Sequence, residues 1–491
     1  MSNDLASPFP IQKALTSDMM LGLKTTAPKS RSYNVSISPS NKSVFAPTDQ
    51  MIFDIPVGRP GTWLDQSQTY LKISVQFATT AAQTAIQTQS GICLDNSAYS
   101  FIKTLYVYNG SNLLELIEQY GQLANYLIDH QLSQADKAGL SSMIGTNPYF
   151  NGCPSSAAYS QWGPVNALCI PGDRTGLSVS TVATATGIST AIPYVFCLPI
   201  LSSVVGVNAS KMIPLKDLTS SINLQFFLAT LDDAIFSAVN GYAWQISSAE
   251  LVAGFVEIDE PQFNQSDTRI PQFIAGKSYK QTSVTIPNNA LGQTDLVVPL
   301  KATSMTQLIA RFRNLSGTLQ GATTGGAYRL SSSVSPNLGS YYWKIADRQI
   351  PQKPVFLVNG SQAGTGGQAF AELSKSFHAL GSIFCNGSIT HLMYHSSLSA
   401  IPNSLFGAGP GAGVSSNGNP SSAFNAFSIA TELETFSNRS DTILCGVNTK
   451  SGPIFLSLNI VVALPSSITC DIFGQYDVIY IIQDGQMSAK A

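Results

Sequence analysis

Histidine, the side chain that most often binds metals or transfers protons near neutral pH, is scarce in this 491-residue chain. The four histidines are His130, His378, His391 and His395. His391 and His395 are four residues apart, the spacing at which two imidazoles on one helix bind zinc. No glutamate stands between them, and Leu392–Tyr394 has the composition of a packed core segment. We therefore interpret these histidines as structural and predict no metal site.

Two pairs of carboxylates are close enough in sequence to suggest acid–base chemistry. Asp232 with Asp233, and Glu432 with Glu434, resemble the paired acids of glycoside hydrolases. Acids this close together in a strand or turn more often form a solvated edge. A serine nucleophile would need a Gly-x-Ser-x-Gly turn between a strand and a helix, and the sequence has none in that context. We predict no catalytic residue and no enzyme activity.

Two glycine-rich runs resemble phosphate-binding loops. In Gly407–Gly413, Pro410 removes a backbone donor, no strand comes directly before the run, and the residues after it continue as a loop. Gly364–Gly367 does precede a helical pattern, so an anion at that helix terminus stays an alternative to a simple glycine-rich turn. We predict no cofactor.

The bulk composition points away from a nucleic-acid-binding protein and toward self-association. The net charge is −2, and charged residues make up 11% of the chain, where soluble domains average about 25%. A surface covered by neutral polar residues suits a protein whose outside is buried against its own copies. A secreted β-rich protein with neutral polar loops is the alternative.

Cysteine usage favours a reducing compartment. Seven cysteines are spread along the chain without a Cys-x-x-Cys pair, which predicts reduced, buried thiols. The start of the chain lacks the pattern of a secretory signal. The longest apolar stretch, residues 192–207, is interrupted by prolines and serines and is too short to cross a bilayer.

The order of expected elements occurs twice. Val107–Ser111 and Leu357–Ser361 each join an apolar run to a helical pattern, and their asparagines are 250 residues apart. Alternating apolar residues predict strands at 70–77 and 307–313. Apolar residues at helical spacing follow each Asn-Gly-Ser triplet: Leu113, Leu116, Ile117, Tyr120, Ala124 and Leu127 in the first copy, and Phe370, Leu373, Phe377 and Leu380 in the second.

Later strands extend the parallel. Ile222–Leu228 corresponds to Ile454–Ile460, and Leu251–Ile258 to Tyr476–Ile482. Many short strands with one helix per half favour an all-β protein of two antiparallel sandwiches, and a jelly roll tolerates long inter-strand loops.

The expected division has four parts and three long loops. The parts are an N-terminal arm (1–45), a first jelly roll (46–260), a linker (261–278) and a second jelly roll (279–491). The loops, at 133–187, 316–336 and 402–423, are expected to project outward or to contact a neighbouring subunit.

Four stretches, in this order, resemble a known family. They are Trp63–Leu71, Met212–Leu215, Leu433–Phe436 and Asp441–Thr449. The chain from about residue 46 onward is similar to the double jelly-roll major capsid proteins of tailless icosahedral DNA viruses, of the Polinton-like virus and virophage type. The likeness rests on order and spacing, because none of these stretches is chemically diagnostic.

The resemblance implies a structural protein of the virion. Each half would be an eight-stranded jelly roll, and three chains would form a pseudo-hexagonal homotrimer that tiles an icosahedral shell by self-assembly. Further partners implied are neighbouring trimers, penton proteins and minor capsid proteins. The mildly basic N-terminal arm would lie beneath the shell, where a weak contact with an internal membrane or the genome stays open, and no sequence-specific nucleic acid binding is expected.

A lectin-like attachment or spike protein built on β-sandwiches is the alternative function. Its loops would carry aromatic and polar residues for a glycan, and Trp162 in the long first-half loop is the best candidate. A monomer with glycan affinity would favour this alternative, whereas a stable trimer would favour the capsid subunit.

Overall fold

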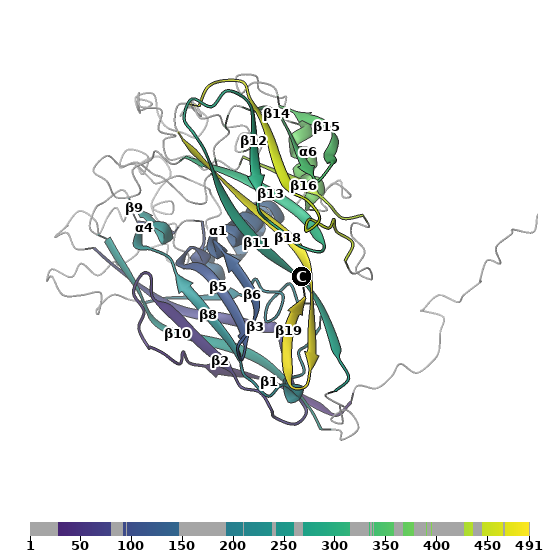
Figure 1. Ribbon diagram of the computed structural model, residues 1–491. Coiled ribbons are helices and arrows are strands. Elements are labelled where there is room, and N and C mark those ends of the chain that lie inside the picture. Colours follow the sequence, from purple (N-terminus) through teal and green to yellow (C-terminus); the bar gives the residue numbers. More distant parts are fainter. Residues whose placement is uncertain are drawn as a thin grey trace, which may run out of the picture.

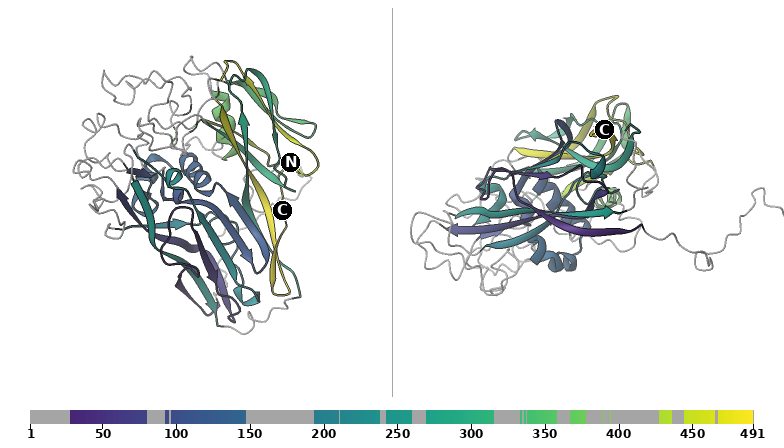
Figure 2. Two further views of the ribbon diagram at one scale, coloured as in Figure 1. Left: turned by 60° about the vertical axis from the view of Figure 1, so that its left-hand side comes forward. Right: turned by 90° about the horizontal axis from the view of Figure 1, so that it is seen from below.

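The protein is described from a computed structural model, in which the backbone forms two β-rich halves side by side (Figures 1 and 2). We call residues 28–259 the first half and residues 269–490 the second half. The structure describes residues 28–79, 92–94, 96–146, 193–209, 211–237, 242–259, 269–314, 333, 336, 338–357, 367–377, 389, 394, 427–435, 444–464 and 467–490.

Two four-stranded antiparallel sheets make up most of the first half. One sheet has the order β1-β10-β3-β7 and the other β2-β8-β5-β6. The strands are β1 (Ser30–Ile37), β2 (Gln50–Ile55), β3 (Thr62–Thr79), β5 (Ile102–Asn109), β6 (Asn112–Glu118), β7 (Tyr194–Pro199), β8 (Ile222–Leu228) and β10 (Tyr242–Ile258). The smaller elements are β4 (Ile92–Leu94), β9 (Ile235–Ser237), α1 (Tyr120–Gln131), α2 (Gln134–Ile144), α4 (Leu231–Ala234) and the 3-10 helices η3 (Ala98–Phe101) and η6 (Leu215–Asp217).

The second half has the same arrangement. Its sheets have the orders β11-β18-β13-β16 and β12-β17-β14-β15, and β19 (Gln486–Lys490) adds to the first of them by pairing with β18. The strands are β11 (Gln272–Ile286), β12 (Gly292–Val298), β13 (Met305–Asn314), β14 (Leu338–Ile345), β15 (Arg348–Phe356), β16 (Ser428–Glu432), β17 (Ile454–Ile460) and β18 (Ile468–Gln483), and the helix is α6 (Gly367–Ser376).

The two halves therefore share one topology. Apart from the short strands β4 and β9, the main strands correspond in chain order, β1 with β11, β2 with β12, β3 with β13 and so on to β10 with β18. This pattern of two four-stranded sheets is a jelly roll, and its repetition confirms the predicted all-β double jelly roll. The expected match of Ile222–Leu228 with Ile454–Ile460 is also confirmed, since these are β8 and β17.

The core of each half lies between its two sheets. Along β3 the alternating residues Leu71, Ile73 and Val75 are 0–1% exposed, as the sequence pattern predicts. In the matching strand β13, Ile309 and Arg311 on the outward face are buried as well. A strand buried on both faces shows that something covers the outer sheet face of the second half.

Three expectations about the helices and turns were wrong. The helical spacing from Leu113 to Ile117 belongs to β6, because pairing with β5 through the tight Gly110-Ser111 turn outweighs periodicity, and α1 begins only at Tyr120. The first half has a second helix, α2, inside the loop expected from residue 133. The Asn-Gly-Ser triplets are not equivalent, since Asn109 ends β5 whereas Asn359 follows β15, the counterpart of β6.

The strand boundaries also differ from the expected division. Ser30–Ile37, assigned to the arm, form β1 and pair along their full length with β10. The expected linker contains the start of β11, which begins at Gln272. Both segments are half-exposed edge strands, and weak apolar alternation makes such strands difficult to distinguish from an arm or linker.

Candidate functional site at the interface between the halves

Of the four histidines, His130 is the one that lies in the described part of the chain. His130 on α1 is buried, with its ring stacked on Phe377 at 5.1 Å between centroids. Burial lowers the pKa of His130 well below its ordinary value, and the charges of Arg311 and Lys137 add to the effect, so the ring is neutral. Among the described residues no group of three or more metal-binding side chains is present. His378, His391, His395, Gly407–Gly413 and Trp162 lie outside the described residues.

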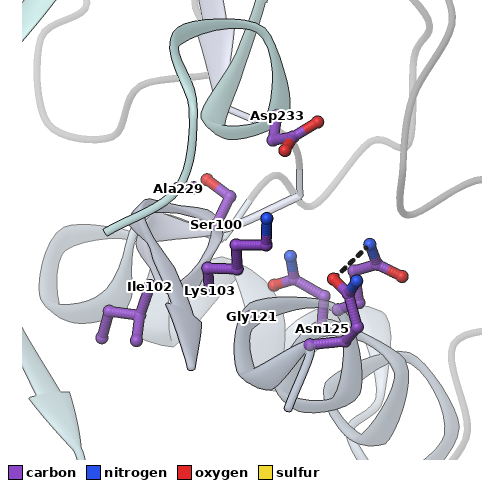
Figure 3. A pocket seen from close by; sticks show the side chains of 9 residues that line it. Ser100, Ile102, Lys103, Gly121, Asn125, Ala229 and Asp233 are labelled. Carbon is purple, nitrogen blue, oxygen red and sulfur yellow. Dashed lines mark hydrogen bonds between the residues drawn. The ribbon is translucent and has the colours of Figure 1, made fainter. Parts of the chain in front are cut away.

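One member of the first carboxylate pair, Asp233, lies beside a very small pocket. Asp233 on α4 borders it together with Lys103 and Asn125 (Figure 3). The pocket holds about 20 Å³, enough for about one water molecule. The side chain of Asp232 lies outside the described residues. This pocket has no room for a sugar ring.

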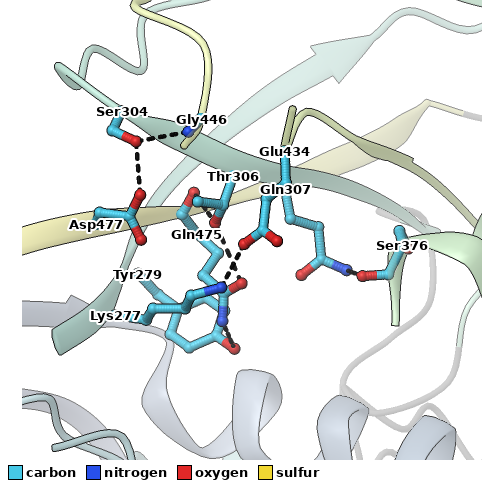
Figure 4. A network of polar contacts seen from close by, with 10 residues as sticks. All are labelled: Lys277, Tyr279, Ser304, Thr306, Gln307, Ser376, Glu434, Gly446, Gln475 and Asp477. Carbon is cyan, nitrogen blue, oxygen red and sulfur yellow. Dashed lines mark hydrogen bonds and ion pairs between the residues drawn. The ribbon is translucent and has the colours of Figure 1, made fainter. Parts of the chain in front are cut away.

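The second carboxylate pair leads into a polar network on the outer face of the second-half sheet (Figure 4). Glu434, whose side chain is 4% exposed, forms an ion pair with Lys277 of β11. Nearby, Ser304 donates to Asp477 at 2.6 Å and accepts from the backbone of Gly446 at 2.9 Å. Burial raises the pKa of Asp477. The network ties the loop after β16 and the loop before β17 to the sheet.

The same network continues along the sheet through neutral side chains. Gln475 donates to Tyr279 at 2.8 Å, and Gln307 donates to the backbone oxygen of Ser376 at 2.8 Å. Each polar group has its partner within the network, which is the arrangement of a structural joint.

The interface between the halves is centred on a buried acid, Glu115 of β6. Its carboxylate, 2% exposed, accepts hydrogen bonds from Ser202, from the backbone and hydroxyl of Ser203 at 3.1 and 2.6 Å, and from Ser278 of β11 at 2.5 Å. Because the Ser203 hydroxyl donates to Glu115, its oxygen accepts from Tyr480 of β18 at 2.5 Å. Burial raises the pKa of Glu115. Glu115 thus joins β6 to β11 directly and to β18 through Ser203.

A second contact is made by the C-terminal hairpin, which runs beside β6 (Figure 1). Asn109, at the end of β5, accepts from the backbone of Met487 at 2.8 Å and donates to the backbone of Ser220 at 2.7 Å. The backbone of Thr219 donates to Gly485 at 2.8 Å. The role of the first Asn-Gly-Ser turn is therefore to hold β19 of the other half.

Helix α1 makes the third contact by covering the outer face of β13 and β16. The buried Arg311 guanidinium lies 5.4 Å from the centre of the Tyr126 ring, and the Tyr126 hydroxyl bonds to Ser428 of β16 at 2.9 Å. This contact explains why the outward residues of β13 are buried.

Sequence reasoning missed Glu115 and Arg311. The available signal was a lone charge inside an apolar strand, as with Glu115 in Leu113–Ile117 and Arg311 in Leu308–Phe312. Charges are rarely fully buried unless paired or hydrogen-bonded. Which surface would bury them depends on how the halves pack, and no local pattern encodes that.

The repeated topology, with the two halves joined through a polar interface, is a double jelly roll. Searches against family models and against curated protein sequences give no match. Among solved structures, this chain is similar to that of the Sputnik virophage, with 14% identity, a TM-score of 0.56, and coverage of 100% of this chain and 94% of the other.

Two major capsid proteins give similar values. The mavirus protein has 10% identity and a TM-score of 0.53, covering 100% of this chain and 96% of its own. The Faustovirus protein has 8% identity and a TM-score of 0.55, covering 96% of this chain and 93% of its own. At such low identity the likeness establishes the fold.

The described cysteines match the predicted buried thiols only in part, because Cys470 is buried whereas Cys197 and Cys445 are half-buried. Cys197, Cys445 and Cys470 are free thiols, and burial raises the pKa of each, which keeps them protonated. None of the helices in the described part of the chain has the length and hydropathy needed to cross a bilayer.

Proposed function

We propose that this chain is the major capsid protein of a virus, and that three copies form a pseudo-hexagonal trimer that tiles an icosahedral shell. The observation that carries the proposal is the repetition of one jelly-roll topology within a single chain. Three chains with two similar halves each supply six similar blocks around a threefold axis, and closed symmetry of this kind is the rule for homo-oligomers.

The rigid joint between the halves supports this function. A shell subunit must present its two blocks at a fixed angle, and Glu115, Asn109 and Tyr126 hold the halves at three separate places. The low charge content supports it as well, because the cores of protein interfaces are depleted in charged residues. We place the chain in the virion, with penton and minor capsid proteins as further partners and with a structural role.

The test is the mass and appearance of the purified protein. Light scattering after size-exclusion chromatography should give three times the chain mass of 52.2 kDa, and negative-stain micrographs should show hexagonal outlines. A protein that stays monomeric at every concentration and never assembles would contradict the proposal. Glycan binding by such a monomer would instead support the lectin-like alternative.

A further inference from the structure

The contact between the halves joins two different surfaces. The first half contributes β6, α1 and the loop segments 200–209 and 211–221. The second half contributes the outer sheet face at β13 and β16, together with Ser278 of β11 and Tyr480 of β18, which point to the opposite face of that sheet. A contact between unlike surfaces leaves one free copy of each surface when the two partners share a fold. Here the free copies are the outer sheet face of the first half and the β15–α6 side of the second half.

The register of the sheets identifies equivalent residues on the covered and the free face. In the second half Arg311 lies opposite Asp471 on one side and opposite Ser428 on the other. In the first half Lys72 lies opposite Glu250 and Cys197 in the same way. Both rows thus have a base in the third strand, an acid in the last strand and a small side chain in the edge strand.

In both rows the acid also accepts a hydrogen bond from a serine in the first strand of the same half. Ser283 of β11 donates to Asp471 at 2.6 Å, and Ser36 of β1 donates to Glu250 at 2.9 Å. We call Ser36, Glu250, Lys72 and Cys197 the free row, and Asp471, Arg311 and Ser428 the covered row; Ser283, at the edge of the covered row, is exposed.

The two rows differ in exposure. In the covered row Arg311 and Asp471 are 2% and 0% exposed. Tyr126 of α1 lies over Arg311, and Arg313 forms an ion pair with Asp471. In the free row the side chains of Lys72 and Glu250 are 39% and 37% exposed, and Val195, two residues from Cys197 on the same face of β7, is 48% exposed. On the opposite free surface, Phe356 at the end of β15 is 61% exposed.

We infer that the free row is the docking surface for the β15–α6 side of a second copy of this chain. This inference rests on the proposed function, and it assigns the surfaces through which the chains of the proposed trimer contact one another. The contact between chains repeats the contact within the chain, so the outer face of every first half is covered by the second half of the next copy. The neutral residues around the free row, with the Lys72–Glu250 ion pair already formed at 3.3 Å, allow it to be buried without an unpaired charge.

A matched pair of valine variants tests the inference. Val195 and Val297 are both exposed, outward-facing residues on edge strands, but Val297 lies on β12 of the other sheet of the second half. Val195→Glu should place an unpaired charge in the contact and reduce the light-scattering mass threefold, to that of one chain. Val297→Glu should remain a trimer. A trimer for Val195→Glu, or a monomer for Val297→Glu alone, would overturn the inference while leaving a trimeric wild type intact.

Labelling of Cys197 gives a second readout in the unaltered chain. Its thiol is half-buried in the single chain, and Cys197→Ser identifies its share of maleimide incorporation. Dilution below the association range should speed its labelling at least tenfold. Equal labelling rates in trimer and monomer would overturn the inference, whereas a wild type that never forms trimers would contradict the proposed function itself.

Discussion

Ser278 donates a hydrogen bond to Glu115 at 2.5 Å across the boundary between the two halves. The two residues lie in strands of different jelly rolls, and both are buried. The described partners of Glu115 are the hydrogen-bond donors Ser202, Ser203 and Ser278, so these serines stabilise the buried acid and are required for the halves to pack. The interface therefore fixes how the two halves are oriented as well as where they meet.

Replacing Glu115 with leucine should destabilise the protein by about 3–5 kcal/mol, because it leaves several buried donors without an acceptor. Glu115→Gln keeps an acceptor oxygen and should cost less than about 2 kcal/mol. Chemical denaturation followed by fluorescence measures both. A leucine variant as stable as the glutamine variant would show that the serine cluster does not stabilise the interface.

Glu115 should also make the stability of the folded protein depend on pH. Burial raises the pKa of Glu115 above its ordinary value of 4.5, so the folded state holds a proton that the unfolded state releases. The contribution of Glu115 is then most favourable below the unfolded pKa and declines as pH rises toward the folded pKa. The melting temperature of Glu115→Gln should therefore gain on that of the wild type as the pH rises above the unfolded pKa. A difference that stays constant over this rise in pH would contradict the assignment.

Lys277 and Glu434 form the ion pair of the polar network, with side chains 39% and 4% exposed. Lys277→Met takes the cation from a buried carboxylate and should cost about 1–3 kcal/mol, reduced from the fully buried case by solvent at the lysine. Lys375→Met is the control, because its pair with Glu372 is a one-turn contact on the surface of α6 and should cost less than about 0.5 kcal/mol. Equal melting temperatures for the two variants would argue against the network.

Gly485 turns the C-terminal hairpin against the first half. It has a φ of 77°, and a Cβ there would lie 2.5 Å from Cγ2 of Thr219. Gly292 has a φ of 81° with open space around it. Gly292→Ala should therefore cost only the backbone strain of about 1–2 kcal/mol, and Gly485→Ala should cost more and loosen the hairpin. Protection of the β19 amides from hydrogen exchange should fall only in Gly485→Ala.

Long regular strands could be predicted from the sequence because they obey period-two burial. Ile222–Leu228 and Ile454–Ile460 were predicted with the bounds that β8 and β17 have, since both strands alternate between the core and the outer face. The order in which strands pair within each sheet could be expected only from the resemblance to a known family, because strand order depends on contacts between residues far apart in the chain.

The interface could not be predicted for a related reason. Leu113–Ile117 fits a helical period as well as a strand, and only its pairing with β5 decides between them. Asn109 looked like one half of a repeated turn, yet its side chain binds Met487, far along the sequence. Residues that hold two folded units together carry no periodic signal, because neither unit needs them to fold.

Two deletions test the role of the N-terminal arm, and the start of β1 at Ser30 decides where they should end. An arm beneath the shell is expected to be dispensable for folding but needed for shell assembly, and the arm bounds from the sequence suggest removing residues 1–40. That deletion also removes β1, whose eight residues pair with β10 and whose Tyr33 packs on Phe255. Removal of residues 1–27 should leave the melting temperature unchanged and the trimer intact while preventing assembly of shells. Removal of residues 1–40 should lower the melting temperature and expose the edge of β10 to aggregation. Intact particles from the shorter deletion would show that the arm has no part in assembly, and a stable trimer from the longer one would show that β1 is not required for the first jelly roll.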